Sequence, residues 1–103
     1  MSNTTPVCAL CGRPERLTRH HLIPRTRHRN RRTRQNYSLA ELQTRIILVC
    51  RPCHYHIHRV FTEKQLERDY NSLEALCHHP EMQRFIGWIA TKPVGFKPKS
   101  PRR

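Results

Sequence analysis

Acidic residues are scarce in this chain of 103 residues: seven Asp and Glu stand against 20 Lys and Arg, a formal net charge of +13. The chain also lacks any run of about 18 apolar residues, and a basic region followed by an apolar stretch is missing from its first residues. We therefore expect neither a membrane span nor secretion, and we expect the protein to act in the cytoplasm. Hydrophobic residues make up only 36% of the chain, so we expect something besides a hydrophobic core to stabilise its single domain.

Positive charge is concentrated in arginine and in one segment. Sixteen of the 20 basic residues are arginine, whose planar guanidinium can bind a phosphate through two hydrogen bonds. Six of them lie in residues 25–34, which contain no acidic residue: Arg25, Arg27, Arg29, Arg31, Arg32 and Arg34. A charge run can simply be a solvated surface, and membrane binding would need an apolar face that this segment lacks. We predict an arginine-rich loop that binds the backbone of a nucleic acid largely without reading base sequence.

The five cysteines form two close pairs and one isolated residue. Cys8 and Cys11 make one C-x2-C pair, Cys50 and Cys53 make a second, and Cys77 stands alone. Four thiolates in two such pairs are typical of a structural tetrahedral zinc site, whereas disulfides would need an oxidising compartment. The 38 residues between the pairs exceed the zinc-ribbon spacing of about 15 to 20. A further unit is therefore predicted between the two halves, and Cys77 is predicted to be a buried small residue in a helix.

Apolar spacing, prolines and capping residues predict a mixture of strands and helices. Strands are predicted at residues 18–23 and 45–49, and helices at 39–44, 54–61, 63–76 and 80–91. Two S/T-x-x-E/Q capping boxes, Ser38 with Glu41 and Thr62 with Gln65, mark two of the helix starts. His79 and Pro80 suit the positions that begin the last helix.

Four histidines stand where their directions can be predicted. His20 and His21 are neighbours on a strand, so their side chains point to opposite faces and have separate roles. His54 and His58 are four residues apart on a helix, so both can bind one ion. Cys53 precedes His54 but points about 100° away around the helix, so one helix start can serve two metal sites. The alternative for each histidine is an ordinary surface or capping residue.

At these residues the sequence resembles the HNH endonucleases, members of the ββα-metal nuclease superfamily, in the subset with a four-cysteine zinc. The similarity rests on CALC at residues 8–11, RHHLIP at 19–24 and LVCRPCHYHIH at 48–58. It implies an α+β fold with a small, treble-clef-like HNH core at residues 8–60. The rest is then a helical extension at 61–91 and a basic flexible tail at 92–103.

The resemblance also implies roles for the histidines. His20, His54 and His58 would bind the catalytic divalent ion, and His21 would be the general base that activates water. Mn²⁺, Ni²⁺, Co²⁺ or Zn²⁺ would then support activity at least as well as Mg²⁺, because imidazoles are softer ligands than carboxylates. The middle Asn of the family motif is missing, since Arg45 stands there.

Other residues are candidates for a supporting role at this site. They are Asn36, Asn30, His28 and His56. Asn36 is the one that we select for the role of the missing Asn, and His56 is expected to point away from the ion.

The predicted function is therefore a metal-dependent DNA endonuclease that nicks one strand with low sequence specificity. A non-catalytic zinc module that binds nucleic acid is the alternative, and a nuclease of structured RNA stays open. The sequence is compatible with either a monomer or a homodimer.

Overall fold

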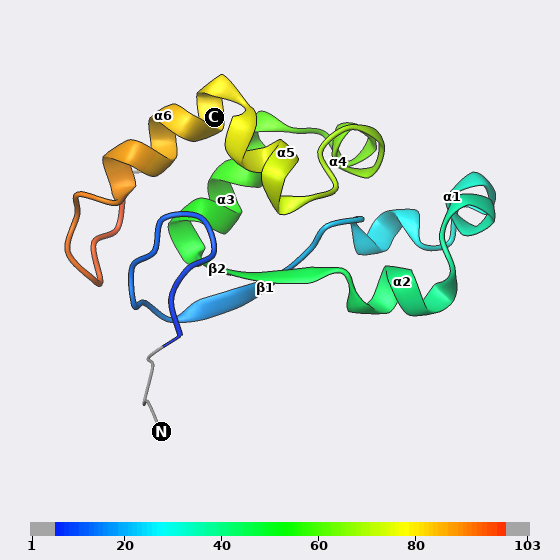
Figure 1. Ribbon diagram of the computed structural model, residues 1–103, viewed down its shortest axis with the longest axis horizontal. Coiled ribbons are helices and arrows are strands. Elements are labelled where there is room, and N and C mark those ends of the chain that lie inside the picture. Colours follow the sequence, from blue (N-terminus) through cyan, green and yellow to red (C-terminus); the bar gives the residue numbers. More distant parts are fainter. Residues whose placement is uncertain (1–5, 99–103) are drawn as a thin grey trace.

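The computed structural model describes residues 6–98, and these form a small α+β structure with a two-stranded sheet and six α-helices (Figure 1). Along the chain the elements are β1 (Leu17–His21), the 3-10 helix η1 (Arg25–Arg27), α1 (Arg31–Asn36), α2 (Leu39–Thr44), β2 (Ile46–Cys50), α3 (Arg51–Val60), α4 (Glu63–Arg68), α5 (Leu73–His78) and α6 (Pro80–Ile89). The predicted α+β class is confirmed. Residues 99–103 of the predicted basic tail lie outside the described residues, and none of the helices that the structure does describe could cross a membrane.

The two strands form an antiparallel pair that is followed directly by α3. Thr18 lies opposite Val49 and His20 opposite Ile47. Strand β2 is apolar and rich in β-branched residues, which favour a pleated surface, and it ends in the buried pair Val49 and Cys50. Helix α3 packs against both strands and against α6 (Figure 1). The order strand, strand, helix therefore brings together the two ends of the segment between Cys11 and Cys50.

Helix α3 contributes to two small hydrophobic clusters through one buried face. Ile57 packs with Phe61, Leu66 and other residues of α4 to α6 in one cluster. Cys53 packs with Val49 and Ile89 in the other. Because each cluster is small, the packing agrees with the expectation that a metal adds to the stability of this fold.

The capping residues fix several helix ends as predicted. Both capping boxes are formed, at Ser38 for α2 and at Thr62 for α4. The side chain of His79 accepts a hydrogen bond from the backbone N–H of Glu81 at the start of α6. These helix starts depend on contacts between residues no more than three apart, which is why the sequence reveals them.

The single helix predicted for residues 63–76 is wrong, because the structure divides it into α4 and α5. Asp69 ends α4, and Ser72 starts α5 by accepting a hydrogen bond from the N–H of Ala75. The side chain of Asn71 donates to the carbonyl of Glu67. Short polar side chains compete in this way with the hydrogen bonds of the helical backbone. Asp69, Asn71 and Ser72 are three such residues within four positions, and the helix ends there.

The prediction of an arginine-rich loop at residues 25–34 is also wrong, since most of the segment is helical. Asn30 caps α1 by accepting hydrogen bonds from the N–H groups of Arg32 and Thr33. Thr33 is fully buried although its neighbours in α1 are charged. The side-chain oxygen of Asn30 is therefore used as a helix cap.

Glu67 of α4 anchors the arginine-rich segment to the rest of the protein. Arg27 Nε donates to one carboxylate oxygen and Thr33 Oγ1 to the other, each at 2.6 Å. Burial raises the pKa of Glu67, but the hydrogen bonds from Thr33 and Arg27 outweigh it and hold that pKa below its ordinary value of 4.5. Arg27 is therefore the arginine of the segment that is held by a carboxylate, whereas the other five are exposed and one of them, Arg34, donates through Nε to the carbonyl of His28.

Replacing Glu67→Gln is expected to lower the free energy of unfolding by about 2 kcal/mol, because it weakens two hydrogen bonds to a buried charge. Urea denaturation at neutral pH measures the loss. The matched control is Glu74→Gln, which changes an exposed carboxylate and is expected to cost less than about 0.5 kcal/mol. Equal losses in the two variants would contradict the anchoring role of Glu67.

The stability difference between wild type and Glu67→Gln is also expected to depend on pH. Because the pKa of Glu67 is lower in the folded than in the unfolded state, its contribution is fully present above about pH 4.5 and is lost as the pH falls through the folded pKa. The stability difference between wild type and Glu67→Gln is therefore expected to shrink below pH 4.5. A difference that stays constant to the lowest pH at which both proteins fold would argue against an ionised Glu67.

Candidate metal centres

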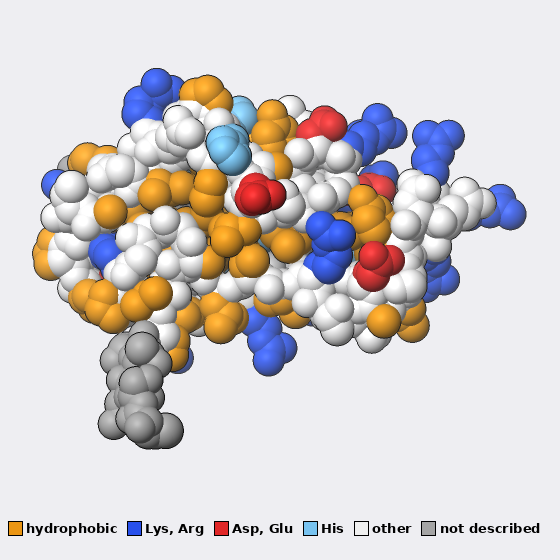
Figure 2. Space-filling model, viewed as in Figure 1, with side chains coloured by type: hydrophobic (Ala, Val, Ile, Leu, Met, Phe, Trp, Pro, Cys, Tyr) orange, Lys and Arg blue, Asp and Glu red, His pale blue; other side chains and the backbone are white. Residues whose placement is uncertain are grey.

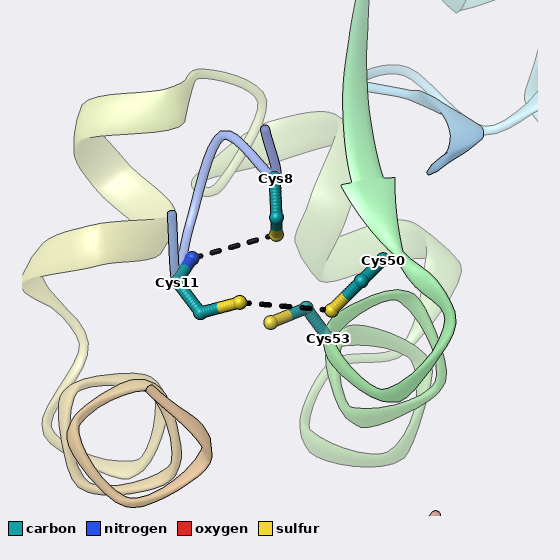
Figure 3. A group of neighbouring side chains, drawn as sticks. All are labelled: Cys8, Cys11, Cys50 and Cys53. Carbon is teal, nitrogen blue, oxygen red and sulfur yellow. Dashed lines mark hydrogen bonds between the residues drawn. The ribbon is translucent and has the colours of Figure 1, made fainter. Parts of the chain in front are cut away.

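Four cysteines from three parts of the chain converge, with sulfur atoms within 4.8 Å of one another. Cys8 and Cys11 come from the turn before β1, Cys50 from the end of β2 and Cys53 from the first turn of α3 (Figure 3). The sulfur atoms of Cys11 and Cys50 are 3.7 Å apart, far beyond a disulfide bond of about 2.0 Å. All four are free thiols, so they form a group that could hold a metal.

The first cysteine pair is shaped by its own backbone. The N–H groups of Leu10 and Cys11 each donate to the Cys8 sulfur at 3.4 Å, and the Gly12 N–H donates to the Cys8 carbonyl at 3.0 Å. Gly12 has a φ of 78°, a left-handed conformation that glycine adopts without strain. Residues 8–12 thus form a tight turn that aims both sulfurs at the second pair.

The chemistry of the four thiols fits zinc. Hydrogen bonding with Cys50 and Cys8 raises the pKa of the Cys53 thiol, and burial and the negative charges of these two neighbours raise it further. Four thiolates therefore need a cation among them. Zn²⁺ is the ion that tetrahedral thiolate groups take in structural sites, and its binding to such a group displaces the thiol protons.

Arg13 is a functional residue that the sequence analysis missed. Its side chain is buried, and it donates to the Cys50 sulfur at 3.7 Å, to the carbonyl of Pro93 at 2.8 Å and to Glu15 at 3.0 Å. Zinc with four thiolates carries a net charge of about −2, which a buried guanidinium beside the sulfurs would partly neutralise. Its position directly after the C-x2-C-G turn was the signal in the sequence.

Three histidines form a second group close to the first. His20 of β1 and His54 and His58 of α3 offer nitrogen atoms within 4.8 Å of one another, and their ring centroids lie 5.1 to 5.4 Å apart. The structure thus brings together the three residues that the sequence selected. Cys53 and His54 serve different groups although they are neighbours, as the helical rotation predicts.

His20 is buried with both ring nitrogens lacking a hydrogen-bond partner. Burial, and then the neighbouring His54 and His58, lower the pKa of His20 to about 3. The ring is therefore neutral at pH 7 and keeps a lone pair. Buried polar atoms without partners are rare and costly, and a divalent ion held by the three imidazoles would satisfy one of them.

Thr18 orients His54 from the neighbouring strand. The Thr18 hydroxyl donates to the carbonyl of Val49 at 2.9 Å and lies 2.8 Å from Nδ1 of His54. Since a hydroxyl has one proton to donate, it accepts from His54 Nδ1–H, which leaves the lone pair on Nε2. Thr18 is the second residue that the sequence analysis missed. Its signal was the two-residue spacing from His20, which places both side chains on one face of the strand.

His21 faces away from His20, as strand alternation predicts. It is half-buried, and its ring centroid is 5.9 Å from that of His28. Burial, followed by the charges of His28 and Arg25, lowers the pKa of His21. A neutral imidazole in this position can accept a proton at pH 7.

The remaining candidates occupy other positions. His56 stacks on Phe85 with ring centroids 4.0 Å apart, away from the three histidines as expected. His28 lies 2.8 Å through Nε2 from the carbonyl of Ile23. Asn36 is exposed at the end of α1, at the far side of the molecule from α3 (Figure 1). Arg45, at the position of the motif's Asn, donates to the carbonyl of Asn71 at 2.6 Å.

The arginine-rich segment gives the protein a charged end. Figure 2 shows Lys and Arg side chains projecting at the end of the molecule that carries α1. The five exposed arginines of the segment are Arg25, Arg29, Arg31, Arg32 and Arg34.

When the protein is purified without added metal, elemental mass spectrometry is expected to find about one zinc ion per chain. Cys53→Ser should lose most of this zinc and unfold at a lower temperature, because metal binding to such a group contributes to folding. Cys77→Ser is the matched control and should keep the zinc, since Cys77 lies outside the cluster. Wild-type protein that stays equally stable after its zinc is removed by a chelator would contradict a structural role.

The comparisons with known proteins identify one relative. Uncharacterized protein YisB of Bacillus subtilis (strain 168) is 34% identical over 88 residues, which cover 84% of this chain and 76% of that protein. No protein-family model and no solved structure matches the chain. The identity and the coverage together show that the chain belongs to the same family as YisB of Bacillus subtilis.

Proposed function

We propose that this protein is a metal-dependent endonuclease of the HNH type that hydrolyses DNA phosphodiester bonds, nicking one strand with low sequence specificity. The observation that carries the proposal is the group of His20, His54 and His58, together with His21, which follows His20 on β1 and is close enough to act on the pKa of His20 and His54. In this proposal β1, β2 and α3 are the ββα-metal core, and the four-cysteine group binds its structural zinc. The free thiols of that group suit a reducing compartment such as the cytoplasm.

The residues of the site divide the reaction between them. His20, His54 and His58 would hold a divalent ion, which when bound supplies Lewis-acid stabilisation of the charge on the phosphate and the leaving oxygen. His21 would take a proton from the attacking water. The HNH resemblance implies products with a 5′-phosphate and a 3′-hydroxyl. Because the ligands are neutral imidazoles, Mn²⁺, Ni²⁺, Co²⁺ or Zn²⁺ would support activity at least as well as Mg²⁺ does.

The exposed arginines are proposed to hold the DNA backbone. Arg25 is among the charges that act on His21, so this surface begins next to the site. Guanidinium groups bind phosphate in two-point contacts without reading bases, which makes the affinity fall steeply with salt.

A non-catalytic zinc module that binds nucleic acid is the second candidate. The exposed arginines favour it as much as they favour the endonuclease, because both functions need phosphate contacts. The two candidates differ in what the histidines do, so a substitution at His21 separates them.

The test is cleavage of supercoiled plasmid in the presence of Mg²⁺, Mn²⁺, Ni²⁺, Co²⁺ or Zn²⁺. The wild type is expected to produce open circles, and His21→Ala to lower the rate by about 100-fold or more, since it removes the general base. DNA binding by the variant should be unchanged.

His78→Ala is the matched control for this experiment. His78 is an exposed histidine of α5 whose Nδ1 lies 2.8 Å from the carbonyl of Glu74, and its loss should leave the cleavage rate within about twofold. Binding without cleavage under every metal would refute the endonuclease and support the binding module. Equal cleavage by wild type and His21→Ala would remove His21 from the mechanism.

A further inference from the structure

A groove of about 1030 Å³ is bounded by α3, by α6 and by residues 94–98. Aromatic side chains make up much of its wall. Tyr55 and Trp88 are 50% and 44% exposed, and Phe85 and Phe96 are half-buried beside them. None of these residues belongs to either metal centre.

The aromatic rings of the groove support one another. Trp88 lies between Phe85 and Phe96, with centroid distances of 5.9 and 5.7 Å. Lys92 Nζ is 5.1 Å from the centroid of Trp88, within the range of a cation–π contact. The rings are thus held in place while part of their surface stays exposed, and exposed apolar patches with a polar rim often mark binding sites.

The groove is also strongly basic. Arg51 and Arg59 are exposed along its edge, and Arg16 and Lys97 lie on it as well. Among the described residues that line it there is one carboxylate, Glu15, and this accepts hydrogen bonds from Arg13 and from the Gly95 N–H. The positive charges of the groove therefore have no free acidic partner within it.

Helix α3 connects the groove to the histidine group. Arg51, Tyr55 and Arg59 are spaced four apart and so form one stripe along the helix, directly beside the stripe of His54 and His58. Arg51 and Tyr55 also line a smaller pocket of about 400 Å³ with Thr18, His54 and His58. A chain that occupies the groove can therefore continue past Arg51 and Tyr55 to the histidines.

We propose that this groove binds an unpaired stretch of DNA, with bases stacked on Tyr55 and Trp88 and phosphates held by Arg51 and Arg59. Exposed aromatic faces bordered by arginine are what single strands require, since every base can stack and every phosphate is charged. A duplex already stacks its bases internally and would leave the rings unused. The inference rests on the proposed function and deepens it: the preferred substrate is DNA with a single-stranded segment next to the cleaved bond.

Trp88 provides the measurement, because it is the one tryptophan in the sequence. Zinc-loaded protein is titrated with a 12-nucleotide oligothymidine, with an abasic strand of the same length and with a 12-base-pair duplex. The oligothymidine is expected to quench the tryptophan fluorescence and to bind about tenfold more tightly than the abasic strand, because only the former can stack. The duplex is expected to bind without quenching.

Two variants test the wall of the groove. Tyr55→Ala and Phe96→Ala are each expected to weaken oligothymidine binding by about tenfold while leaving duplex binding unchanged. Leu39→Ala, which removes an exposed apolar side chain of α2 outside the groove, is the matched control and should change neither. Zinc content and circular dichroism confirm that each variant is folded.

Equal affinity for the oligothymidine and the abasic strand, or an unchanged fluorescence, would overturn the proposal. So would a dimer in sedimentation that Tyr55→Ala dissociates, because the groove would then bind a second copy of the chain. His21→Ala is expected to keep the oligothymidine affinity and the quenching while losing cleavage. In the wild type, cleavage without a preference for unpaired strands refutes the groove alone, whereas quenching and binding without any cleavage refute the endonuclease alone.

Discussion

The convergence of the four cysteines at the start of α3 is the constraint on which the rest of the structure depends. It joins the turn at Cys8 to the end of β2 and to α3, although 38 residues of the chain separate the two cysteine pairs. The hydrophobic clusters on either side of α3 are small, and one of them includes three of the cysteines themselves. Fixing the first turn of α3 in this way also fixes the direction of His54, one residue after Cys53. The geometry of the histidine group therefore depends on that of the cysteine group.

Much of the fold follows from local signals, and several of the exceptions come from distant partners. The capping boxes at Ser38 and Thr62, the cap at His79 and the alternation of His20 with His21 involve neighbours in sequence, so they could be predicted. The helical arginine segment could not, because Thr33 is buried by its bond to Glu67, 34 residues further along the chain. Arg13 and Thr18 have a signal in their spacing from Cys11 and His20, but their partners are distant in sequence too. Each acts on a cysteine or histidine that becomes a neighbour only in the folded protein.

Three surfaces meet on α3, and their order around the helix gives the proposals a common basis. The buried face carries Cys53 and Ile57, the next carries His54 and His58, and the third carries Arg51, Tyr55 and Arg59. If both proposals hold, one helix of ten residues would position a structural metal, a catalytic ion and a strand of substrate relative to one another. Rigid elements place such groups more accurately than loops do.

The central claim is that two different metal sites stand side by side, one built of thiolates and one of imidazoles. Anomalous diffraction from crystals grown with zinc and then soaked in Mn²⁺ tests it directly, with data collected at energies that distinguish the two elements. The account predicts a zinc peak among Cys8, Cys11, Cys50 and Cys53 and a manganese peak among His20, His54 and His58. A zinc peak with no density for any metal among the histidines, at Mn²⁺ concentrations that saturate ordinary enzyme sites, would contradict it.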